Sequence, residues 1–189
     1  MLERIIEIDT ELLIYLNNFG SETWDGFWMF MTTTITSIPV YLIAVFFIYK
    51  KYGIKKTLVS LLFLALLITM SDQLANLFKY GFGRLRPCHD VDVQDLIRLV
   101  KASCGGKYSF FSAHASTSMA IAVYFSLLLR KNQKYFAIFL ISWAFLVGYS
   151  RIYIGVHYPF DVLFGFTVGF LIGIIVYKFL QFIFRKYFD

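Results

Sequence analysis

Three short segments of the chain hold side chains that could bind an anion or transfer a proton. Together they contribute Lys79, Arg84, Arg86, His114, Arg151, His157 and Asp161. Arginine binds phosphate oxygens through planar bidentate hydrogen bonds, and lysine adds a point charge. If these cations meet at one place, they form an anion site, and phosphate is the anion that best needs several cations at once.

The C-terminal segment pairs a histidine with an acid four residues later. If residues 157–161 are helical, His157 and Asp161 share one face of that helix, and Pro159 fits its first turn. A carboxylate on one ring nitrogen fixes the tautomer and makes the other nitrogen a better nucleophile. The alternative is an interfacial salt bridge among Arg151, His157 and Asp161.

The middle segment opens a long apolar run at Ser112, Ala113 and His114. Free N–H groups and the positive dipole end at the start of a helix stabilise an anion. Ser112 adds a hydroxyl, and Ala113 keeps the approach open. His114 at this position could donate a proton to a leaving group. The alternative is a hydrogen-bonded histidine with a structural role.

Composition indicates which elements must position these residues. Of 189 residues, 59% are apolar and 16% charged, and the mean hydropathy is +0.67. These values exclude an ordinary soluble domain and a disordered chain. We predict an all-α polytopic membrane helix bundle, formed by a single domain over residues 1–189. About five transmembrane helices are expected, with six possible, from the runs Phe27–Tyr49, Thr57–Phe78, Tyr108–Leu129, Tyr135–Ser150 and Val162–Tyr177.

The N-terminal segment alternates apolar residues with acids at helical spacing. An amphipathic helix lying on the outer membrane interface fits this pattern, and Asn17, Asn18 and Gly20 would end it. The alternative is a sixth, poorly formed span.

Basic residues indicate the orientation. With alternating spans, ten of the 18 lysines and arginines fall on one side, which the positive-inside rule makes cytoplasmic. They are Lys50, Lys51, Lys55, Lys56, Arg130, Lys131, Lys134, Lys178, Arg185 and Lys186. The net charge of +6 is then a topology signal, and nucleic acid is not expected as a partner. The three segments with chemistry fall at the outer ends of spans.

The outer loop, about residues 81–107, contains both cysteines, Cys88 and Cys104. An outward-facing pair can form a disulfide. Two free thiols are the alternative, because the sequence does not supply the Cα separation.

The last span carries small residues at every fourth position, Gly165, Gly169 and Gly173. They allow close helix packing, either inside the protomer or at a dimer interface.

The three segments resemble the signature motifs of the type-2 phosphatidic-acid phosphatase superfamily, which also includes vanadium haloperoxidases. K-x6-R-P matches Lys79–Pro87, and S-R-x5-H-x3-D matches Ser150–Asp161. P-S-G-H is kept only in part, as Phe111–His114. Alanine in place of the motif glycine is tolerated if the local φ is negative.

The resemblance implies a role for each matched position. His157 would be the nucleophile that forms a phosphohistidine, Asp161 would orient it, and His114 would protonate the leaving oxygen. The phosphoryl oxygens would be held by Lys79, Arg86, Arg151, Ser112 and backbone amides near Ala113. No metal or other cofactor is expected, because cations replace the metal.

Three further residues are accessory candidates. Arg84 binds a distal phosphate or lipid head group, or is a solvated loop arginine. Asp72, two turns before Lys79, pairs with Lys79 or with a neighbouring polar group, and a purely structural hydrogen bond is the alternative. Ser150 belongs to the third motif.

The resemblance implies a lipid phosphatase of a bacterial inner membrane, with its site facing the periplasm. Undecaprenyl diphosphate is the leading expected substrate, converted to undecaprenyl phosphate. A lipid A phosphatase or a phosphatidylglycerophosphate phosphatase is the alternative, and a non-catalytic anion-binding or transport protein is the rival from another class. The partners would be the lipid substrate and membrane lipids, and the chain would be a monomer or weak dimer.

Overall fold

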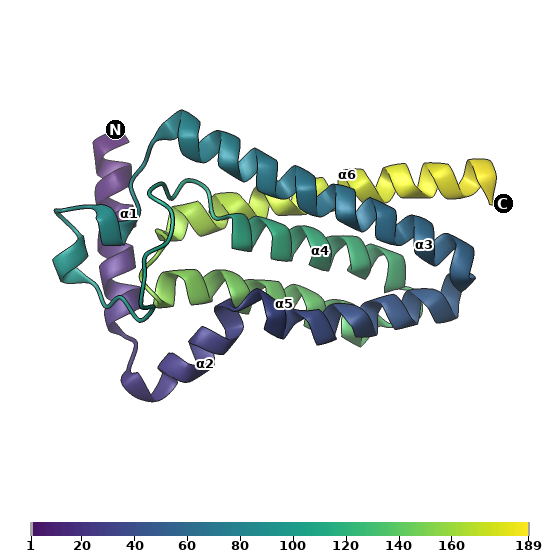
Figure 1. Cartoon of the computed structure of the whole chain (residues 1–189), viewed down its shortest axis with the longest axis horizontal. Helices are drawn as coiled ribbons and strands as arrows, with labels where there is room; N and C mark the ends of the chain where they lie inside the picture. Colours follow the sequence, from purple (N-terminus) through teal and green to yellow (C-terminus); the bar gives the residue numbers. More distant parts are fainter. Residues whose placement is uncertain (1, 189) are drawn as a thin grey trace.

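The computed structural model describes residues 2–188, so Met1 and Asp189 lie outside the described residues. The expected all-α fold is confirmed, because residues 2–188 contain helices and one isolated β-bridge but no strand (Figure 1). The helices are α1 (Leu2–Asn18), α2 (Glu22–Thr32), α3 (Thr34–Phe82), α4 (Ala113–Leu129), α5 (Lys134–Tyr153) and α6 (Pro159–Tyr187), with short 3-10 turns η1 (Pro87–His89) and η2 (Gln94–Leu96).

Helix α3 is bent sharply at Gly53, where φ is 71° and ψ is 176°. Glycine has no Cβ and adopts this backbone conformation without steric cost. At 1.5 Å per residue, a straight helix of this length would measure about 70 Å, far more than the hydrocarbon core of a bilayer. The bend turns it into two antiparallel arms, residues 34–52 and 54–82 (Figure 1).

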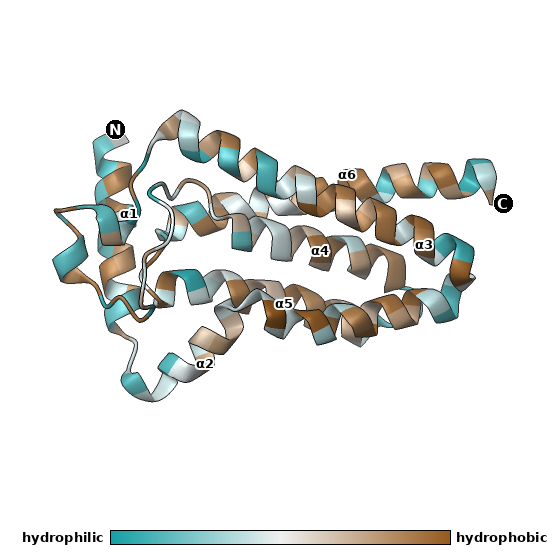
Figure 2. Ribbon diagram, in the orientation of Figure 1, coloured by the Kyte–Doolittle hydropathy of each residue, from teal (hydrophilic) through white to brown (hydrophobic). Residues whose placement is uncertain are grey.

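Helices α3, α5 and α6 are long and apolar enough to cross a membrane, and α4 is a shorter apolar helix. Hydrophobic residues run along the bundle, whereas hydrophilic residues gather at its two ends (Figure 2). With α3 divided at Gly53, these helices supply five apolar segments. The number that span the bilayer stays a prediction.

Two expected helix boundaries are wrong. The run Phe27–Tyr49 is not one helix, because Thr33 is extended and separates α2 from α3. The hydroxyl of Thr36 donates to the carbonyls of Phe30 and Thr33, which offers the backbone an alternative to helical hydrogen bonds.

The third run also begins later than expected, at Ala113 instead of Tyr108. Ser112 is the N-cap of α4, and its hydroxyl accepts from the Ala115 N–H. The outer loop therefore extends from Gly83 to Ser112.

The glycines of α6 pack against α4. A Cβ at Gly165 would lie 2.8 Å from the carbonyl oxygen of Ser112, and a Cβ at Gly173 would lie 2.8 Å from that of Ala120. Only glycine lets the two backbones approach this closely. Packing inside the protomer is therefore confirmed as a use of this glycine series, and it holds the start of α4 beside the start of α6.

Helix α1 crosses one end of the bundle, roughly at right angles to the long helices (Figure 1). It ends at Asn18, where the sequence predicts a stop. Ile5, Ile8 and Tyr15 are exposed on this helix. Its position on the membrane interface stays a prediction.

Candidate active site

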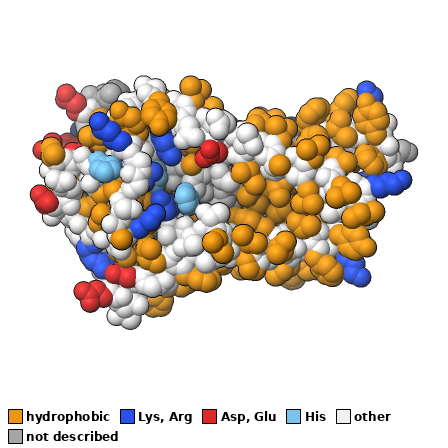
Figure 3. Space-filling model, in the orientation of Figure 1, with side chains coloured by type: hydrophobic (Ala, Val, Ile, Leu, Met, Phe, Trp, Pro, Cys, Tyr) orange, Lys and Arg blue, Asp and Glu red, His pale blue; other side chains and the backbone are white. Residues whose placement is uncertain are grey.

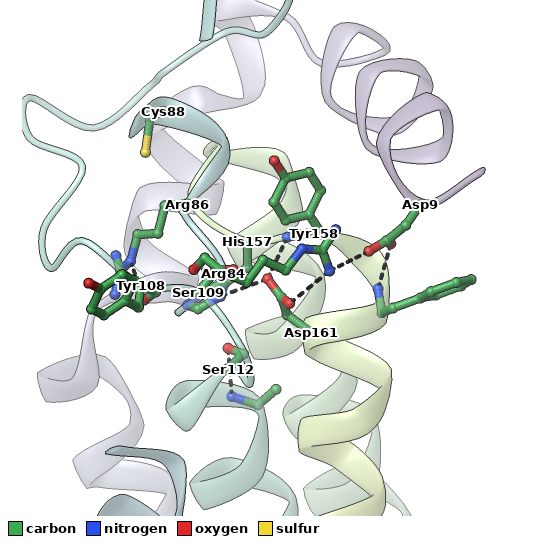
Figure 4. A network of polar contacts seen from close by, with 12 residues as sticks. Asp9, Arg84, Arg86, Cys88, Tyr108, Ser109, Ser112, His157, Tyr158 and Asp161 are labelled. Carbon is green, nitrogen blue, oxygen red and sulfur yellow. Dashed lines mark hydrogen bonds and ion pairs between the residues drawn. The ribbon is translucent and has the colours of Figure 1, made fainter. Parts of the chain in front are cut away.

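The three segments converge at the end of the bundle that α1 covers (Figure 4). The end of α3 supplies Lys79, the following loop supplies Arg84 and Arg86, and the start of α4 supplies Ser112 and His114. The remaining residues come from the α5–α6 connection: Arg151, His157 and Asp161.

The buried pair of His157 and Asp161 forms at the start of α6. Nδ1 of His157 lies 3.4 Å from Oδ2 of Asp161, and the two side chains are 1% and 0% exposed. The helix begins at Pro159, so His157 precedes it instead of sharing a helical face with Asp161. Proline is favoured in the first turn and disfavours helical backbone in the residue before it. The Asp161 carboxylate turns back to accept from the Tyr158 N–H at 3.0 Å, which fixes its orientation.

Electrostatics keep His157 neutral. Burial lowers its pKa well below the ordinary value of 6.5, and the nearby Arg151, Arg86 and Lys79 lower the pKa further. Three cations, two from the first motif and one from the third, therefore act on one imidazole. An imidazole in this state has a free ring nitrogen for attack, in surroundings prepared for an anion.

Arg86 is held by the outer loop. Its Nη1 donates to the carbonyl of Cys104 at 2.6 Å, and its Nε donates to that of Tyr108 at 3.3 Å (Figure 4). Cys104 is joined to Cys88 by a disulfide, with Cα atoms 6.0 Å apart. The disulfide thus ties together the two loop segments that flank this arginine.

Arg151 is buried, with 4% exposure. Its Nη1 donates to the Thr32 hydroxyl, which connects the site to the break between α2 and α3. Its Nε has no acceptor among the described residues, so a phosphate oxygen can be its partner. The neighbouring Ser150 donates to the carbonyl of Val147 at 2.6 Å and is fully buried, which is a structural contact inside α5.

The start of α4 is joined directly to the histidine–aspartate pair. The Ser112 N–H donates to the carbonyl of Asp161 at 3.1 Å. Within residues 2–188 only glycines have a positive φ, so Ala113 is unstrained where the motif has glycine. His114, in the first turn of α4, is half-buried.

A cavity of about 390 Å³ extends from Ala113 and His114 down between the two arms of α3. Its deeper wall is apolar and includes Ile68 and Ile121. Asp72 also lines the cavity and accepts from the Asn76 side chain at 3.2 Å. This contact within α3 fits a neighbouring polar partner and a structural hydrogen bond equally, so an accessory role for Asp72 stays a prediction.

Arg84 is partly buried and pairs with two carboxylates. Its binding of a distal phosphate or head group stays a prediction. Its Nη1 lies 2.7 Å from Oδ2 of Asp9 and 3.2 Å from Oδ1 of Asp161 (Figure 4). The guanidinium carbon lies 3.7 Å from the centre of the Tyr158 ring. Arg84 therefore joins α1 to the site through two ion pairs.

Sequence reasoning missed Asp9, which is fully buried. Burial raises its pKa, against the opposing effects of the Phe160 N–H and of Arg84. The available signal was an acid on the helix face that also carries Leu13 and Leu16, where an amphipathic pattern calls for an apolar residue.

Membrane-length apolar helices thus place a buried histidine among cations at one end of the bundle, and a histidine nucleophile with cations around it is what phosphoryl transfer requires. The family model described as PAP2 superfamily matches residues 57–185. The chain belongs to the PAP2 superfamily, the family that its three motifs resemble, and is a phosphoric ester hydrolase.

Several relatives cover most of the chain. It is 35% identical to a lipid A 4'-phosphatase of Bacteroides thetaiotaomicron over 89% of this chain and 75% of the relative. It is 34% identical to a lipid A 4'-phosphatase of Porphyromonas gingivalis over 94% and 75%. An undecaprenyl-diphosphatase of Sulfolobus acidocaldarius is 32% identical over 88% and 76%.

The fold is shared with a solved structure. The crystal structure of a transmembrane PAP2-type phosphatidylglycerolphosphate phosphatase from Bacillus subtilis superimposes with a TM-score of 0.75. The match covers 98% of this chain and 90% of that chain at 23% identity.

Proposed function

We propose that this membrane phosphatase removes the 4'-phosphate of lipid A. The observation that carries the choice of substrate is the pair of lipid A 4'-phosphatases, which match at 35% and 34% identity over 89% and 94% of the chain. The motif resemblance alone favoured undecaprenyl diphosphate, and the relatives support the lipid A alternative better. Undecaprenyl diphosphate remains the second candidate because of the 32% identical diphosphatase.

The proposed reaction begins with His157. Because Asp161 faces Nδ1, Nε2 is the nitrogen with a lone pair, and it attacks phosphorus. The bond between phosphorus and the sugar oxygen breaks, and His114 donates a proton to that oxygen. His114 then takes a proton from water as the water attacks the phosphohistidine, which releases inorganic phosphate and restores His157.

Three cations stabilise the charge that spreads over the phosphoryl oxygens. We assign this role to Lys79, Arg86 and Arg151, with the hydroxyl of Ser112 and the free amides at the start of α4. Because these cations can take the place of a metal ion, hydrolysis without an added metal ion is part of the proposal.

The proposed location is a bacterial inner membrane, with the site facing the periplasm. The site and α1 lie at one end of the bundle, and the bend of α3, the α4–α5 turn and the C-terminus lie at the other (Figure 1). Lysine and arginine side chains mark the latter end in the space-filling view (Figure 3). The positive-inside rule makes this end cytoplasmic.

Phosphate release from defined lipids tests the proposal. The panel contains lipid A with only a 4'-phosphate, lipid A with only a 1-phosphate, undecaprenyl diphosphate and phosphatidylglycerophosphate, all in EDTA. We expect the first lipid to have the highest kcat/KM, His157→Ala to be inactive, and His89→Ala to match the wild type, because His89 is exposed in the loop.

Each other outcome contradicts a defined part of the proposal. Preference for another lipid of the panel overturns the substrate. Loss of activity in EDTA overturns the metal-free mechanism, and turnover by His157→Ala overturns the nucleophile. A wild type that releases phosphate from none of these lipids favours the transport protein.

A further inference from the structure

Helix α1 buries two polar residues, Asp9 and Asn17, on the face that packs against the protein. Asp9, Leu13 and Asn17, each four residues apart, are fully buried. Ile8 and Tyr15 are 47% and 69% exposed. A buried carboxylate is costly unless it is paired, so the position of Asp9 requires an explanation.

Asp9 makes two contacts with the active-site end of the bundle. Its Oδ1 accepts from the Phe160 N–H at 2.8 Å, at the first turn of α6. Its Oδ2 lies 2.7 Å from Nη1 of Arg84. A residue near the N-terminus is thus bound to the two segments that enclose the histidine–aspartate pair.

The contacts continue to the proposed nucleophile. The Nη1 of Arg84 that meets Asp9 also donates to Oδ1 of Asp161 at 3.2 Å, and the other Asp161 oxygen faces His157. The stacking of Arg84 on the Tyr158 ring restricts the guanidinium from one side. Asp9, Arg84, Asp161 and His157 therefore form one continuous chain of polar contacts (Figure 4).

Docking of α1 does not by itself explain the charge of Asp9, because Asn17 supplies a neutral anchor. The Asn17 side chain donates to the carbonyls of Tyr153 at 2.7 Å and Arg98 at 3.1 Å, and accepts from the Arg98 N–H at 2.6 Å. A carboxylate at Asp9 adds an ion pair with Arg84, which also contacts Asp161.

We propose that Asp9 is a positioning residue that acts through Arg84 to hold Asp161 against His157, so that α1 forms part of the active site. The proposal rests on the roles proposed above for His157 and Asp161. Arg84 is shared by two carboxylates, and its position depends on both. Nδ1 of His157 lies 3.4 Å from Oδ2 of Asp161, at the long end of the hydrogen-bond range. A small displacement of Asp161 would therefore break this contact.

The test replaces Asp9 by asparagine, which has the same shape and keeps an oxygen for the Phe160 N–H, but loses the ion pair. Glu11→Gln is the matched control, because Glu11 is exposed on the same helix and loses the same charge. We expect Asp9→Asn to lower kcat by about tenfold to a hundredfold, as misplaced catalytic groups do. KM should stay within about twofold of the wild-type value, because Asp9 does not touch the substrate, and Glu11→Gln should match the wild type.

Two further measurements separate positioning from a general structural role. Inhibition by inorganic phosphate reports the cation site, so Asp9→Asn should keep the wild-type inhibition constant. Arg84→Gln should also lower kcat, and the double variant Asp9→Asn/Arg84→Gln should be no slower than Arg84→Gln alone, because the two residues act through one path.

The outcomes are distinguishable. Three results would each overturn the role of Asp9. They are an unchanged kcat in Asp9→Asn, additive losses of kcat in the double variant, and much weaker inhibition of Asp9→Asn by inorganic phosphate. A wild type that is inactive towards every lipid phosphate overturns the proposed function, and the role of Asp9 with it. An active wild type with an unaffected Asp9→Asn variant overturns only the inference about α1.

Discussion

At the scale of single residues, the neutral state of His157 has a consequence for pH dependence. A lowered pKa means that the imidazole stays unprotonated, and nucleophilic, at pH values where an ordinary histidine with a pKa of 6.5 is charged. The acid limb of kcat/KM for the wild type should therefore have its midpoint below pH 6.5, after correction for the ionisation of the substrate, measured by phosphorus NMR.

The same argument predicts the effect of a variant. Arg86 is one of the cations that lower the pKa of His157, so Arg86→Gln should move the acid midpoint upwards, towards pH 6.5. Lys107→Gln removes the same charge from an exposed position of the same loop and should leave the midpoint unchanged. A midpoint that moves equally in both variants would show that net charge, and not the local arrangement, sets this pKa.

We expect Asp72 to contribute to the choice of lipid. Its carboxylate lines the cavity beside His114, and a sugar offers hydroxyl and amide donors there that an isoprenoid chain lacks. Asp72→Ala should lower kcat/KM for lipid A 4'-phosphate by about tenfold, the value of one hydrogen bond to a charged group. Turnover of undecaprenyl diphosphate should not change.

The control for Asp72 is its chain neighbour Gln73, which is exposed on the same helix. Gln73→Ala should leave the ratio of the two kcat/KM values at the wild-type level. An equal loss on both lipids in Asp72→Ala would assign Asp72 to folding or to the phosphate site instead of to substrate choice.

The motif residues could be predicted from the sequence because their chemistry and spacing are local. Lys79, Arg86 and the pair of His157 and Asp161 come together as their types suggest. Asp9 could not be assigned, because its partner Phe160 is 151 residues away and no local pattern encodes that contact. Arg84 was visible as a cation, but its two carboxylate partners become apparent only once α1 is placed.

At the scale of secondary-structure elements, the contact between α6 and α4 sets the position of the second motif. A Cβ at Gly169 would lie 2.9 Å from the carbonyl carbon of Ser116, two residues after His114. Gly169→Ala should therefore push α4 away and lower the free energy of unfolding by about 1–3 kcal/mol, the usual cost of overpacking. Activity should fall with it, because His114 moves.

The matched substitution is Gly26→Ala in α2, where nothing lies within 4 Å of the added Cβ. Alanine is the better helix former, so this variant should be as stable as the wild type or slightly more stable. Thermal unfolding in detergent, followed by circular dichroism, compares the two. Equal stability of both variants would contradict the close contact between α6 and α4.

Hydrophobic runs and glycines predicted most of the elements, since these signals are strong in a membrane protein. The bend at Gly53 lies between the first two expected spans, among basic residues that the sequence places on the cytoplasmic side. The break at Thr33 was missed because residues 27–49 are uncharged, and hydropathy does not distinguish a helix from a short extended residue within an apolar run. Hydrogen bonds from the Thr36 hydroxyl to backbone carbonyls stabilise that boundary.

At the scale of the whole molecule, the lysine-rich loops and the candidate active site lie at opposite ends. The bend of α3 and the α4–α5 turn carry lysines at the end far from the site (Figure 1, Figure 3). Moving such a cluster across the bilayer is unfavourable, so this end should remain cytoplasmic and the site should face outwards.

Cysteine labelling in cells tests this orientation. Residues 131 and 107 are both exposed lysines, one in the α4–α5 turn and the other in the outer loop. Cys88 and Cys104 are joined to each other, so an introduced cysteine is the only free thiol within residues 2–188. A membrane-impermeant maleimide should label Lys107→Cys in intact cells and Lys131→Cys only after permeabilisation. The reverse pattern would place the phosphate site in the cytoplasm and would exclude hydrolysis of a lipid presented on the outer leaflet.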